Sequence, residues 1–408
     1  MNSLSIPSKR KNKLKELTRL MNRQNEMPVL PIRQILELLD YDVTDEELDF
    51  LIRLGTTART KEEIAALSGM DSEACNVLID QLIRKGFLWP EPGSEGLEKL
   101  QLTPVVVGWL EFQLLAGQES PRSYEFAKRL ENLFQAAKKL NVFPIRNLSN
   151  LLARRVLKPY QTIGTIPHVP SKNKGASIQI NRNVEYAPST VFPIHDAYEL
   201  VDRHGTNNQV AVVHCFCRRW RQMTNGPCRF DLPFESCVVV GPGAVYMSDY
   251  GFGRKVQKND ALKLLEEMAK GGAIHTLFHE KDDTRLPNVA VCNCCWDCCG
   301  LYGSFNRGMI PLYFKSHYLA RVKAPTSCKA CKKCVSHCPT AAITIQKDRA
   351  EIQAKKCIGC GQCALQCPTN SISLEFLTRD VLVPLEKKSK TRLSEGMKTA
   401  KSFNPGRL

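Results

Sequence analysis

The residues with the clearest chemistry are eight cysteines between Cys328 and Cys367. They form two runs, CKACKKCVSHCP and CIGCGQCALQCP, each with the spacing Cys-x2-Cys-x2-Cys-x3-Cys-Pro. Three cysteines at this close spacing can wrap around one cubic iron–sulfur cluster, whereas the fourth lies too far along the chain to close the same cage. Zinc sites usually pair two short Cys-x2-Cys units per metal and leave the third and fourth cysteines of such runs without a role.

This doubled pattern resembles the two-cluster 4Fe-4S ferredoxins of the bacterial type. The resemblance covers the two runs and the strands that flank them. It implies that the fourth cysteine of each run ligates the other cluster. The implied ligands are Cys328, Cys331, Cys334 and Cys367 for the first cluster, and Cys357, Cys360, Cys363 and Cys338 for the second.

The segments around these runs predict the walls of a small β domain. Strands are expected at 342–345 and 371–374, with a turn at 347–349. Gly359 and Gly361 let backbone amides approach the sulfurs, and six aliphatic side chains exclude water. The six are Ile343, Ile345, Ile352, Ile358, Ile372 and Leu374.

The first cysteine loop is unusually basic, with Lys329, Lys332 and Lys333. Nearby positive charge favours the reduced, more negative state of a cluster, so we expect the first cluster to have the higher reduction potential. As an alternative, the same lysines suit contact with an acidic partner.

Composition restricts the class of protein. A chain of 408 residues with 43% hydrophobic residues is long enough for two or three globular domains. Its first residues are polar and basic, so no secretory signal is expected, and no apolar run reaches membrane-spanning length. Eighteen cysteines in such a chain indicate metal ligation in a reducing cytoplasm rather than disulfides.

Positive charge is unevenly distributed along the chain. The formal net charge is +16, yet residues 41–118 hold six Lys/Arg against fourteen Asp/Glu. Much of the excess lies in two expected mobile arms, either simply solvated or docking to an acidic partner. Their basic residues are Lys9, Arg10, Lys11, Lys13, Lys15, Arg19 and Arg23 in the first, and Lys387, Lys388, Lys390, Arg392, Lys398, Lys401 and Arg407 in the second.

We expect an α+β protein with several domains. A winged-helix-like domain precedes a small α/β cysteine-rich middle domain, and a ferredoxin-like two-cluster domain follows. The expected ranges are a basic arm with short helices at 1–40, the winged-helix-like domain at 41–118, a helix and connector at 119–175, the cysteine-rich domain at 176–310, the two-cluster domain at 311–380 and a basic tail at 381–408.

The winged-helix prediction rests on three helix starts followed by a hairpin. Thr44 and Thr60 precede acidic first turns, and a third helix begins at Asp71 or Ser72. It carries Cys75 on its apolar face, and a hairpin then returns to Val107. DNA-reading helices present basic or amide side chains, whereas this third helix is acidic, so protein docking or dimerisation is favoured over nucleic-acid binding.

The middle of the chain alternates strand and helix signals. Strands are expected at Ser177–Ile180, Gln209–Val213, Cys237–Val240, Ala273–His279 and Asn288–Val291. Helices are expected near 193–203 and 259–270, and an amphipathic helix carries Phe126, Leu130 and Phe134 before a connector at 163–175.

Two of these strands lead into cysteines, which indicates at least one further metal centre, most plausibly another iron–sulfur cluster. One group can supply four thiolates alone, as Cys215, Cys217, Cys228 and Cys237, and zinc on this set is the alternative. A second group is too large for one cluster, so one centre or two are both open. Its members are Cys292, Cys294, Cys295, Cys298 and Cys299.

Charged neighbours of Cys217 allow two interpretations. Arg218, Arg219 and Arg221 either bind an anion or raise a cluster's potential, or they form a solvated basic turn. His214 is either a ligand or a hydrogen-bonded neighbour.

The whole order of segments resembles a family of anaerobe-type iron–sulfur proteins. That resemblance implies an electron carrier or an accessory redox protein. The leading hypothesis is a cytoplasmic, oxygen-sensitive protein that passes single electrons through two 4Fe-4S clusters and a third centre to a redox partner. The alternatives are a redox-responsive DNA-binding regulator and a reductase acting at the middle metal centre. The sequence offers no nucleophile elbow, Walker loop or dinucleotide fingerprint, so no catalytic residue is assigned.

Overall fold

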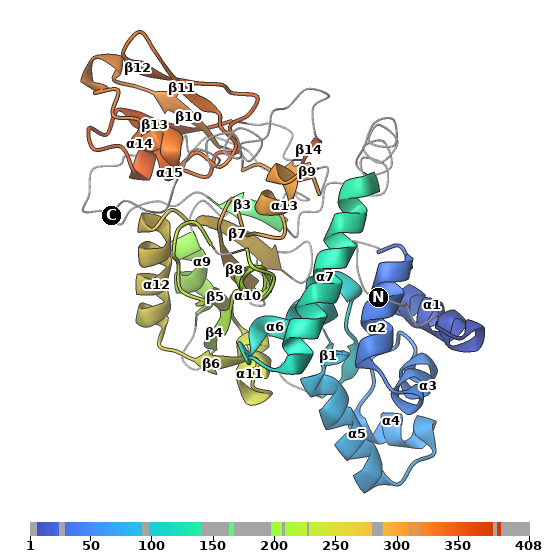
Figure 1. The fold of residues 1–408 in the computed structure, drawn as a ribbon. Helices are drawn as coiled ribbons and strands as arrows, with labels where there is room; N and C mark the ends of the chain where they lie inside the picture. The colour runs from blue at the N-terminus through green and yellow to red at the C-terminus, as the bar shows by residue number, and fades with distance from the viewer. Residues whose placement is uncertain are drawn as a thin grey trace.

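A computed structural model describes most of the chain, in three parts: a helical part, a central sheet with helices, and a ferredoxin-like part (Figure 1). The basic residues expected in the tail and the strand expected at Ser177–Ile180 lie outside the described residues. The described residues are 6–23, 29–91, 98–140, 163–166, 197–205, 209–226, 228–279, 289–309, 312–316, 318–377 and 382–384.

The first basic segment is part of the fold. α1 (Ser8–Asn22) packs with α2 (Arg33–Asp42), and Arg10 pairs with Asp40 and Asp45, each at 2.5 Å. The expectation of a mobile arm is therefore wrong for α1, because its apolar stripe is buried and its charges meet acidic residues of the same chain. The fully buried apolar side chains of α1 are Leu14, Leu17 and Met21.

Three helices follow in the expected order. Thr44 and Thr60 cap their helices as predicted, each within a capping box, and Asp71 caps the third helix. Cys75 is completely buried, as expected for a core thiol. The helices are α3 (Asp45–Leu54), α4 (Lys61–Ser68) and α5 (Ser72–Arg84).

A short hairpin comes next, in which β1 (Leu88–Pro90) pairs antiparallel with β2 (Leu100–Leu102). The predicted continuation of the return strand to Val107 is wrong, because Pro104 lacks the N–H that a strand ladder needs. An irregular turn at Val105–Trp109 follows instead.

Two further helices complete this part. α6 (Leu110–Leu115) is short, and α7 (Pro121–Leu140) is the predicted amphipathic helix, with Phe126 and Leu130 buried. α7 packs against α2, and the buried residues of α1 to α7 form one continuous core.

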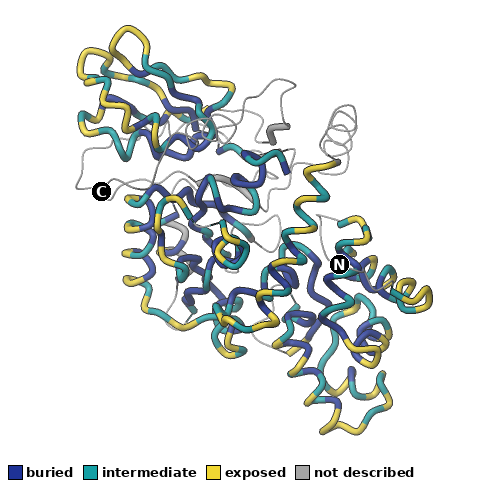
Figure 2. Tube along the Cα trace, viewed as in Figure 1, coloured by how far each residue is buried: buried dark blue, intermediate teal, exposed yellow. Residues whose placement is uncertain are grey.

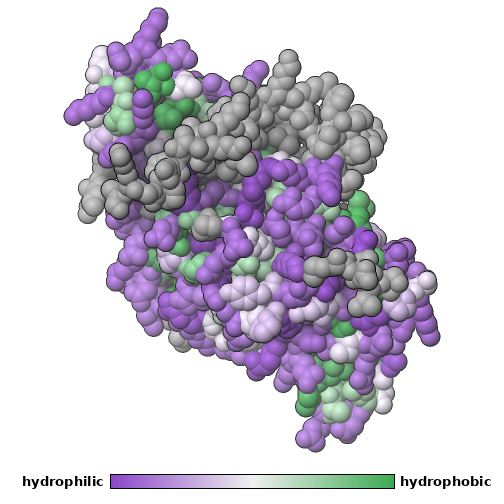
Figure 3. Space-filling view, in the orientation of Figure 1, coloured by the Kyte–Doolittle hydropathy of each residue, from purple (hydrophilic) through white to green (hydrophobic). Residues whose placement is uncertain are grey.

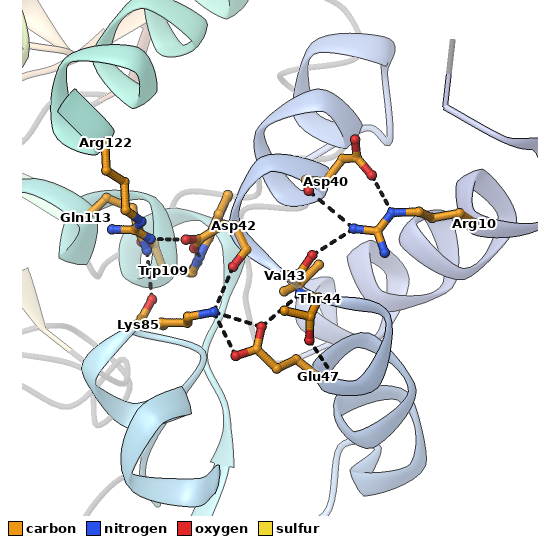
Figure 4. Close-up of polar contacts among 10 residues, drawn as sticks. All are labelled: Arg10, Asp40, Asp42, Val43, Thr44, Glu47, Lys85, Trp109, Gln113 and Arg122. Carbon is orange, nitrogen blue, oxygen red and sulfur yellow. Dashed lines mark hydrogen bonds and ion pairs between the residues drawn. The ribbon is translucent and has the colours of Figure 1, made fainter. Parts of the chain in front are cut away.

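A polar network inside this core joins helices far apart in sequence (Figure 4). The buried carboxylate of Asp42 accepts a 2.8 Å hydrogen bond from the Trp109 indole and pairs with Arg122. Lys85 pairs with Glu47 at 2.7 Å and also donates to the Asp42 carbonyl. The expected boundary between residues 40 and 41 falls inside α2, so the structure does not separate the first helices from those that follow.

The central sheet has six strands among the described residues, in the order β3-β7-β8-β5-β4-β6. Every pairing is antiparallel, so the predicted α/β arrangement is wrong for this sheet. Alternating strand and helix signals give the order of elements but not the strand directions. The strands are β3 (Ile163–Ile166), β4 (Val210–His214), β5 (Glu235–Val240), β6 (Gly253–Lys255), β7 (Ile274–His279) and β8 (Val289–Cys294).

Strands β4, β5 and β7 confirm the predictions made for their segments, each within about two residues. Three strands differ from expectation, among them β6, which was not predicted. β3 lies in the segment expected to be a connector, and it forms an edge of the sheet beside β7. β8 continues past Val291 to Cys294, so Cys292 lies on the strand itself.

Helices cover both faces of the sheet. α9 and α12 pack on one face through an apolar cluster that includes Val201, Leu265 and Val212. The other face meets α10, α11 and the helical part, where Phe134 of α7 stacks on Trp220 of α10 at 4.4 Å between ring centroids. The helices are α9 (Ala197–His204), α10 (Phe216–Met223), α11 (Pro242–Asp249), α12 (Lys258–Lys270) and the short α13 (Tyr302–Asn306).

The last part has the expected strands and turn. Lys347 and Asp348 both have positive φ values, +46° and +56°, as a tight two-residue hairpin turn requires. Gln362 donates to the carbonyls of Ala269 and Ala273, which fixes this part on the end of α12. Its elements are β9 (Leu312–Phe314) paired with β14 (Leu382–Pro384), β10 (Tyr318–Val322) paired with β13 (Ile372–Phe376), β11 (Ile343–Gln346) paired with β12 (Arg349–Ile352), the 3-10 turn Pro325–Ser327, and the helices α14 (Lys333–Ser336) and α15 (Gln362–Leu365).

Buried residues run through all three parts of the chain (Figure 2). Within the described residues, no helix combines the length and apolar character that a membrane crossing demands.

Glu111 makes the stability of the helical part depend on pH. Its carboxylate accepts a 2.7 Å hydrogen bond from the Gly108 amide, yet burial raises the pKa of Glu111 to about 7. The folded state therefore binds a proton that the unfolded state has released between about pH 4.5 and 7, and stability falls as pH rises through this window. Glu111→Gln should be more stable than the wild type at pH 8, by about 1–3 kcal/mol, and no more stable at pH 4.5.

Thermal unfolding of the oxygen-free protein at the two pH values measures this difference. Glu98→Gln, at an exposed position, is the control and should show no such dependence. An equal shift of the midpoint at both pH values in Glu111→Gln would rule out titration of Glu111 as the cause.

Candidate metal centres

Four of the C-terminal cysteines line one cavity of about 320 Å³. Apolar side chains, Ile343, Ile352 and Ile358, complete its wall, as the sequence predicts. Burial raises the pKa of Cys338, Cys360 and Cys363, so a thiolate at these positions needs a cationic partner. The four cysteines are Cys338, Cys357, Cys360 and Cys363.

The other four line a second cavity of about 330 Å³. Ile345 and Ile372 form part of its wall, whereas Leu374 lies in the apolar cluster beneath both cavities. The four cysteines are Cys328, Cys331, Cys334 and Cys367. The structure thus brings together each set of four that the sequence resemblance implies, with Cys338 and Cys367 exchanged between the two runs.

The two cysteine loops repeat the same backbone path. Gly359 and Gly361 have φ values of +72° and +82°, and the matching Ala330 and Lys332 have +49° and +62°. This left-handed conformation is unusual for a residue with a side chain. It curls each loop around its cavity, and the first loop adopts this shape without glycine at either position.

Backbone amides point at the sulfurs. Ala342 donates to Cys338 Sγ at 3.2 Å, and Ser371 donates to Cys367 Sγ at 3.3 Å. Hydrogen bonds of this kind stabilise negative charge on sulfur and tune a cluster's potential. Four converging sulfurs, apolar walls and amide donors fit a thiolate-held cubic cluster in each cavity.

The middle cysteines lie on and beside the central sheet. Cys292 and Cys294 alternate along β8 and therefore face the same side. In the antiparallel pair of β5 and β8, Val238 lies opposite Val291, which places Cys237 beside Cys292. Cys215 immediately precedes α10, and Cys217 lies in its first turn.

Six of these thiols form a ring of neighbours. Cys215 is hydrogen-bonded to Cys217 and Cys237, and Cys299 to Cys217 and Cys294. These bonds lower the pKa of Cys215 and Cys299, which would share their neighbours' protons as thiolates. The ring consists of Cys215, Cys217, Cys237, Cys292, Cys294 and Cys299.

The remaining three thiols form a separate group with a carboxylate. Donor atoms of Cys228, Cys295, Cys298 and Asp297 all lie within 4.8 Å of one another. Hydrogen bonds from Cys295 and Cys298 lower the pKa of Cys228 to about 2, whereas burial raises that of Asp297. The set that the sequence offers for a single site, Cys215, Cys217, Cys228 and Cys237, is thus divided, because Cys228 belongs to this second group.

Arg218 is the cation that lies between the two groups. Its guanidinium is 1% exposed and donates to Cys295 Sγ at 3.2 Å. Burial opposes its charge, but the thiolates of Cys215 and Cys295 outweigh this effect and raise the pKa of Arg218. It also donates to Ser236 on β5 and to the carbonyl of Asn293 on β8.

The other charged residues next to Cys217 make different contacts from those of Arg218. Arg219 pairs with Glu119 at 2.9 Å and Arg221 pairs with Glu131 at 3.0 Å, so both fasten α10 to the helical part. The interpretation of these arginines as a solvated turn is wrong, and of the three only Arg218 reaches a thiol by a hydrogen bond. His214 lies 3.9 Å from Glu235 and outside both thiol groups, as a neighbour rather than a member.

Sequence reasoning missed Asp297 and the role of Gly300. Asp297 lies inside the cysteine run itself, so a Cys-x-Asp-Cys pattern was the available signal. A Cβ atom at Gly300 would lie 3.1 Å from Cys217 Sγ, which explains why glycine follows the last two cysteines.

The cavity lined by Cys338, Cys357, Cys360 and Cys363 and the thiol ring are in contact through packed side chains. Ile358 and Cys360 share one buried apolar cluster with Cys294, Trp296 and Cys299. Cys331, in the first loop, is exposed on the other side. The thiol groups therefore form a series from the surface to the central sheet.

Exchange of the fourth cysteine between the two sets gives a direct prediction. If each cavity holds one cluster, Cys338→Ala should lose the same electron paramagnetic resonance signal as Cys357→Ala, although Cys338 lies in the other sequence run. Cys367→Ala should match Cys328→Ala in the same way. Spectra of the four reduced variants, prepared without oxygen, make the comparison, and pairing by sequence run would contradict the arrangement.

Comparison with known proteins identifies one region. Residues 327–371 match the family model for a 4Fe-4S dicluster domain. No curated protein and no solved structure matches the chain. The C-terminal region is therefore a ferredoxin-like iron–sulfur domain, and the remaining described parts rest on their own geometry.

Proposed function

We propose that this protein transfers single electrons through two 4Fe-4S clusters and an iron–sulfur centre in the thiol ring of the central sheet. The first cluster would be held by Cys328, Cys331, Cys334 and Cys367, and the second by Cys357, Cys360, Cys363 and Cys338. The clusters supply the redox chemistry, while this chain spaces them, excludes water from the second one and tunes their potentials.

The observation that carries this proposal is the continuous packing from the cavity of the second cluster, lined by Cys338, Cys357, Cys360 and Cys363, to the thiol ring. Cys360, Cys299 and Trp296 belong to the same buried apolar cluster. Electron transfer needs closely spaced centres in a rigid, dry surrounding rather than a substrate pocket. The two cavities and the ring meet that requirement without assigning catalysis to any residue.

We place the partner's docking site at the first cysteine loop. Cys331, Lys329, Lys332 and Lys333 are all exposed there, which offers a short path and a positive surface. A positive patch around an exposed redox centre steers an acidic partner into contact. Oxygen-sensitive clusters and free thiols suit a reducing compartment, and we propose the cytoplasm.

The helical part supports a protein-docking role, as a winged-helix-like module, better than nucleic-acid binding. The basic residues at the end of α5 already have partners within the chain. Lys85 pairs with Glu47, and the Arg84 guanidinium lies 5.9 Å from the centre of the Tyr250 ring. Val77 is 54% exposed on the same helix, and hydrophobic residues gather over this end of the molecule in Figure 3. An apolar, acidic helix face does not attract phosphates.

Metal content tests the proposal. Protein purified without oxygen should contain acid-labile sulfide and about twelve irons, of which about eight belong to the C-terminal domain. Reduction should give electron paramagnetic resonance signals from interacting clusters. Colourless protein without sulfide would refute electron transfer, and about eight irons would refute the centre in the thiol ring.

The basic loop gives a second prediction. Replacing Lys329, Lys332 and Lys333 by alanine removes positive charge near the first cluster, so its reduction potential should fall while that of the second stays unchanged. At low ionic strength the same variant should be reduced more slowly by anionic dithionite but not by cationic reduced methyl viologen.

Lys347→Ala, on the exposed β11–β12 turn, is the control for both measurements. An unchanged or raised potential of the first cluster in the triple variant would reject the tuning role. Equal slowing with both reductants would reject electrostatic steering.

A further inference from the structure

We infer that Cys228, Cys295, Cys298 and Asp297 hold a single zinc ion, separate from the iron–sulfur centre proposed for the thiol ring. The middle cysteines then serve two different metals. The inference begins from the division of the nine thiols into a wide ring and a compact group, which the sequence alone does not reveal.

The compact group has the dimensions of a one-metal site. Cys228 Sγ and Cys295 Sγ lie 3.1 Å apart, and all four donor atoms lie within 4.8 Å of one another. Sulfurs bound to one tetrahedral zinc at about 2.3 Å are about 3.8 Å apart. A cubic cluster holds its thiolates farther apart, because each one binds a different iron atom. Among the described residues, this is the one group of His, Cys, Asp and Glu donors that is so compact.

The donor set also suits zinc. Zinc takes thiolate and carboxylate ligands together and prefers four of them in a closed site. Three thiolates and one carboxylate carry four negative charges. The Arg218 guanidinium offsets one of them, because it donates a hydrogen bond to Cys295 Sγ. A divalent ion removes two of the remaining charges, which makes burial of Cys295 and Cys298 tolerable.

Surrounding groups hold the donors in place. The two carboxylate oxygens of Asp297 accept backbone N–H bonds, from Cys298 at 2.7 Å and from Arg229 at 2.6 Å. Each oxygen keeps a second lone pair for a metal. Cys295 and Cys298 rest on an apolar cluster with Met268 and Ala273, so the ion is shielded on that side. Such supporting contacts orient ligands at metal sites.

A metal ion at this site would connect two segments of the middle domain that are far apart in sequence. It joins the loop at Cys228 to the turn that follows β8, and that turn also carries Cys299 of the thiol ring. A zinc ion here would fix the turn and keep three thiols from competing for iron. This role differs from electron transfer, because zinc does not change oxidation state.

Zinc-edge X-ray absorption on the full chain, purified without oxygen, tests the inference. We expect about one zinc per chain, bound by three sulfurs at about 2.3 Å and one oxygen. Cys228→Ala should lose the zinc and keep the wild-type iron and sulfide content. Cys237→Ala, in the thiol ring, is the matched control and should lose iron while keeping zinc.

Absence of zinc, or zinc with four sulfur ligands, would overturn the inference, as would loss of iron rather than zinc in Cys228→Ala. The wild-type spectrum alone is decisive if either variant fails to fold. Its result is independent of the proposed function: zinc without sulfide would uphold this site and refute electron transfer, and sulfide without zinc would do the reverse.

Discussion

A buried guanidinium among thiols is the interaction on which the centre of this molecule depends. Arg218 cannot lose its proton, so its burial requires negatively charged or polar partners. It finds them in Cys215, Cys295 and Cys298, and in the carbonyl of Asn293. The same side chain binds β5 through Ser236, so the electrostatics of the thiols and the alignment of β5 with β8 are fixed together.

Around that centre, the helical part and the ferredoxin-like domain meet the sheet by different means. The helical part packs through a large apolar core, reinforced by Arg219 and Arg221 on α10. The ferredoxin-like domain joins through Ile358 and Cys360 and through hydrogen bonds from Gln362. The apolar core and the two arginines hold the helical part against the sheet. The contacts of Ile358, Cys360 and Gln362 keep the thiols of the ferredoxin-like domain next to the thiol ring.

Local spacing predicted which three cysteines of each run lie together, and the resemblance to two-cluster ferredoxins supplied the exchanged fourth cysteine. Local patterns also predicted the helix caps at Thr44 and Thr60, which involve only neighbouring residues. The middle domain was harder. Pairing of Cys228 with Cys295, of β3 with β7 and of Arg10 with Asp40 joins segments distant in sequence, and no periodicity encodes such contacts. The prediction of strand direction in the central sheet was wrong for the same reason, because the order of elements along the chain does not determine how they pair.

The left-handed backbone of Lys332 has an energetic consequence. At the equivalent position of the other loop, Gly361 adopts this conformation without steric strain, whereas a residue with a Cβ is strained by roughly 1–2 kcal/mol. Glycine would thus be the less costly choice at position 332. The lysine at this position therefore places a long cationic side chain at the surface beside the first cluster's cavity at the cost of local backbone strain.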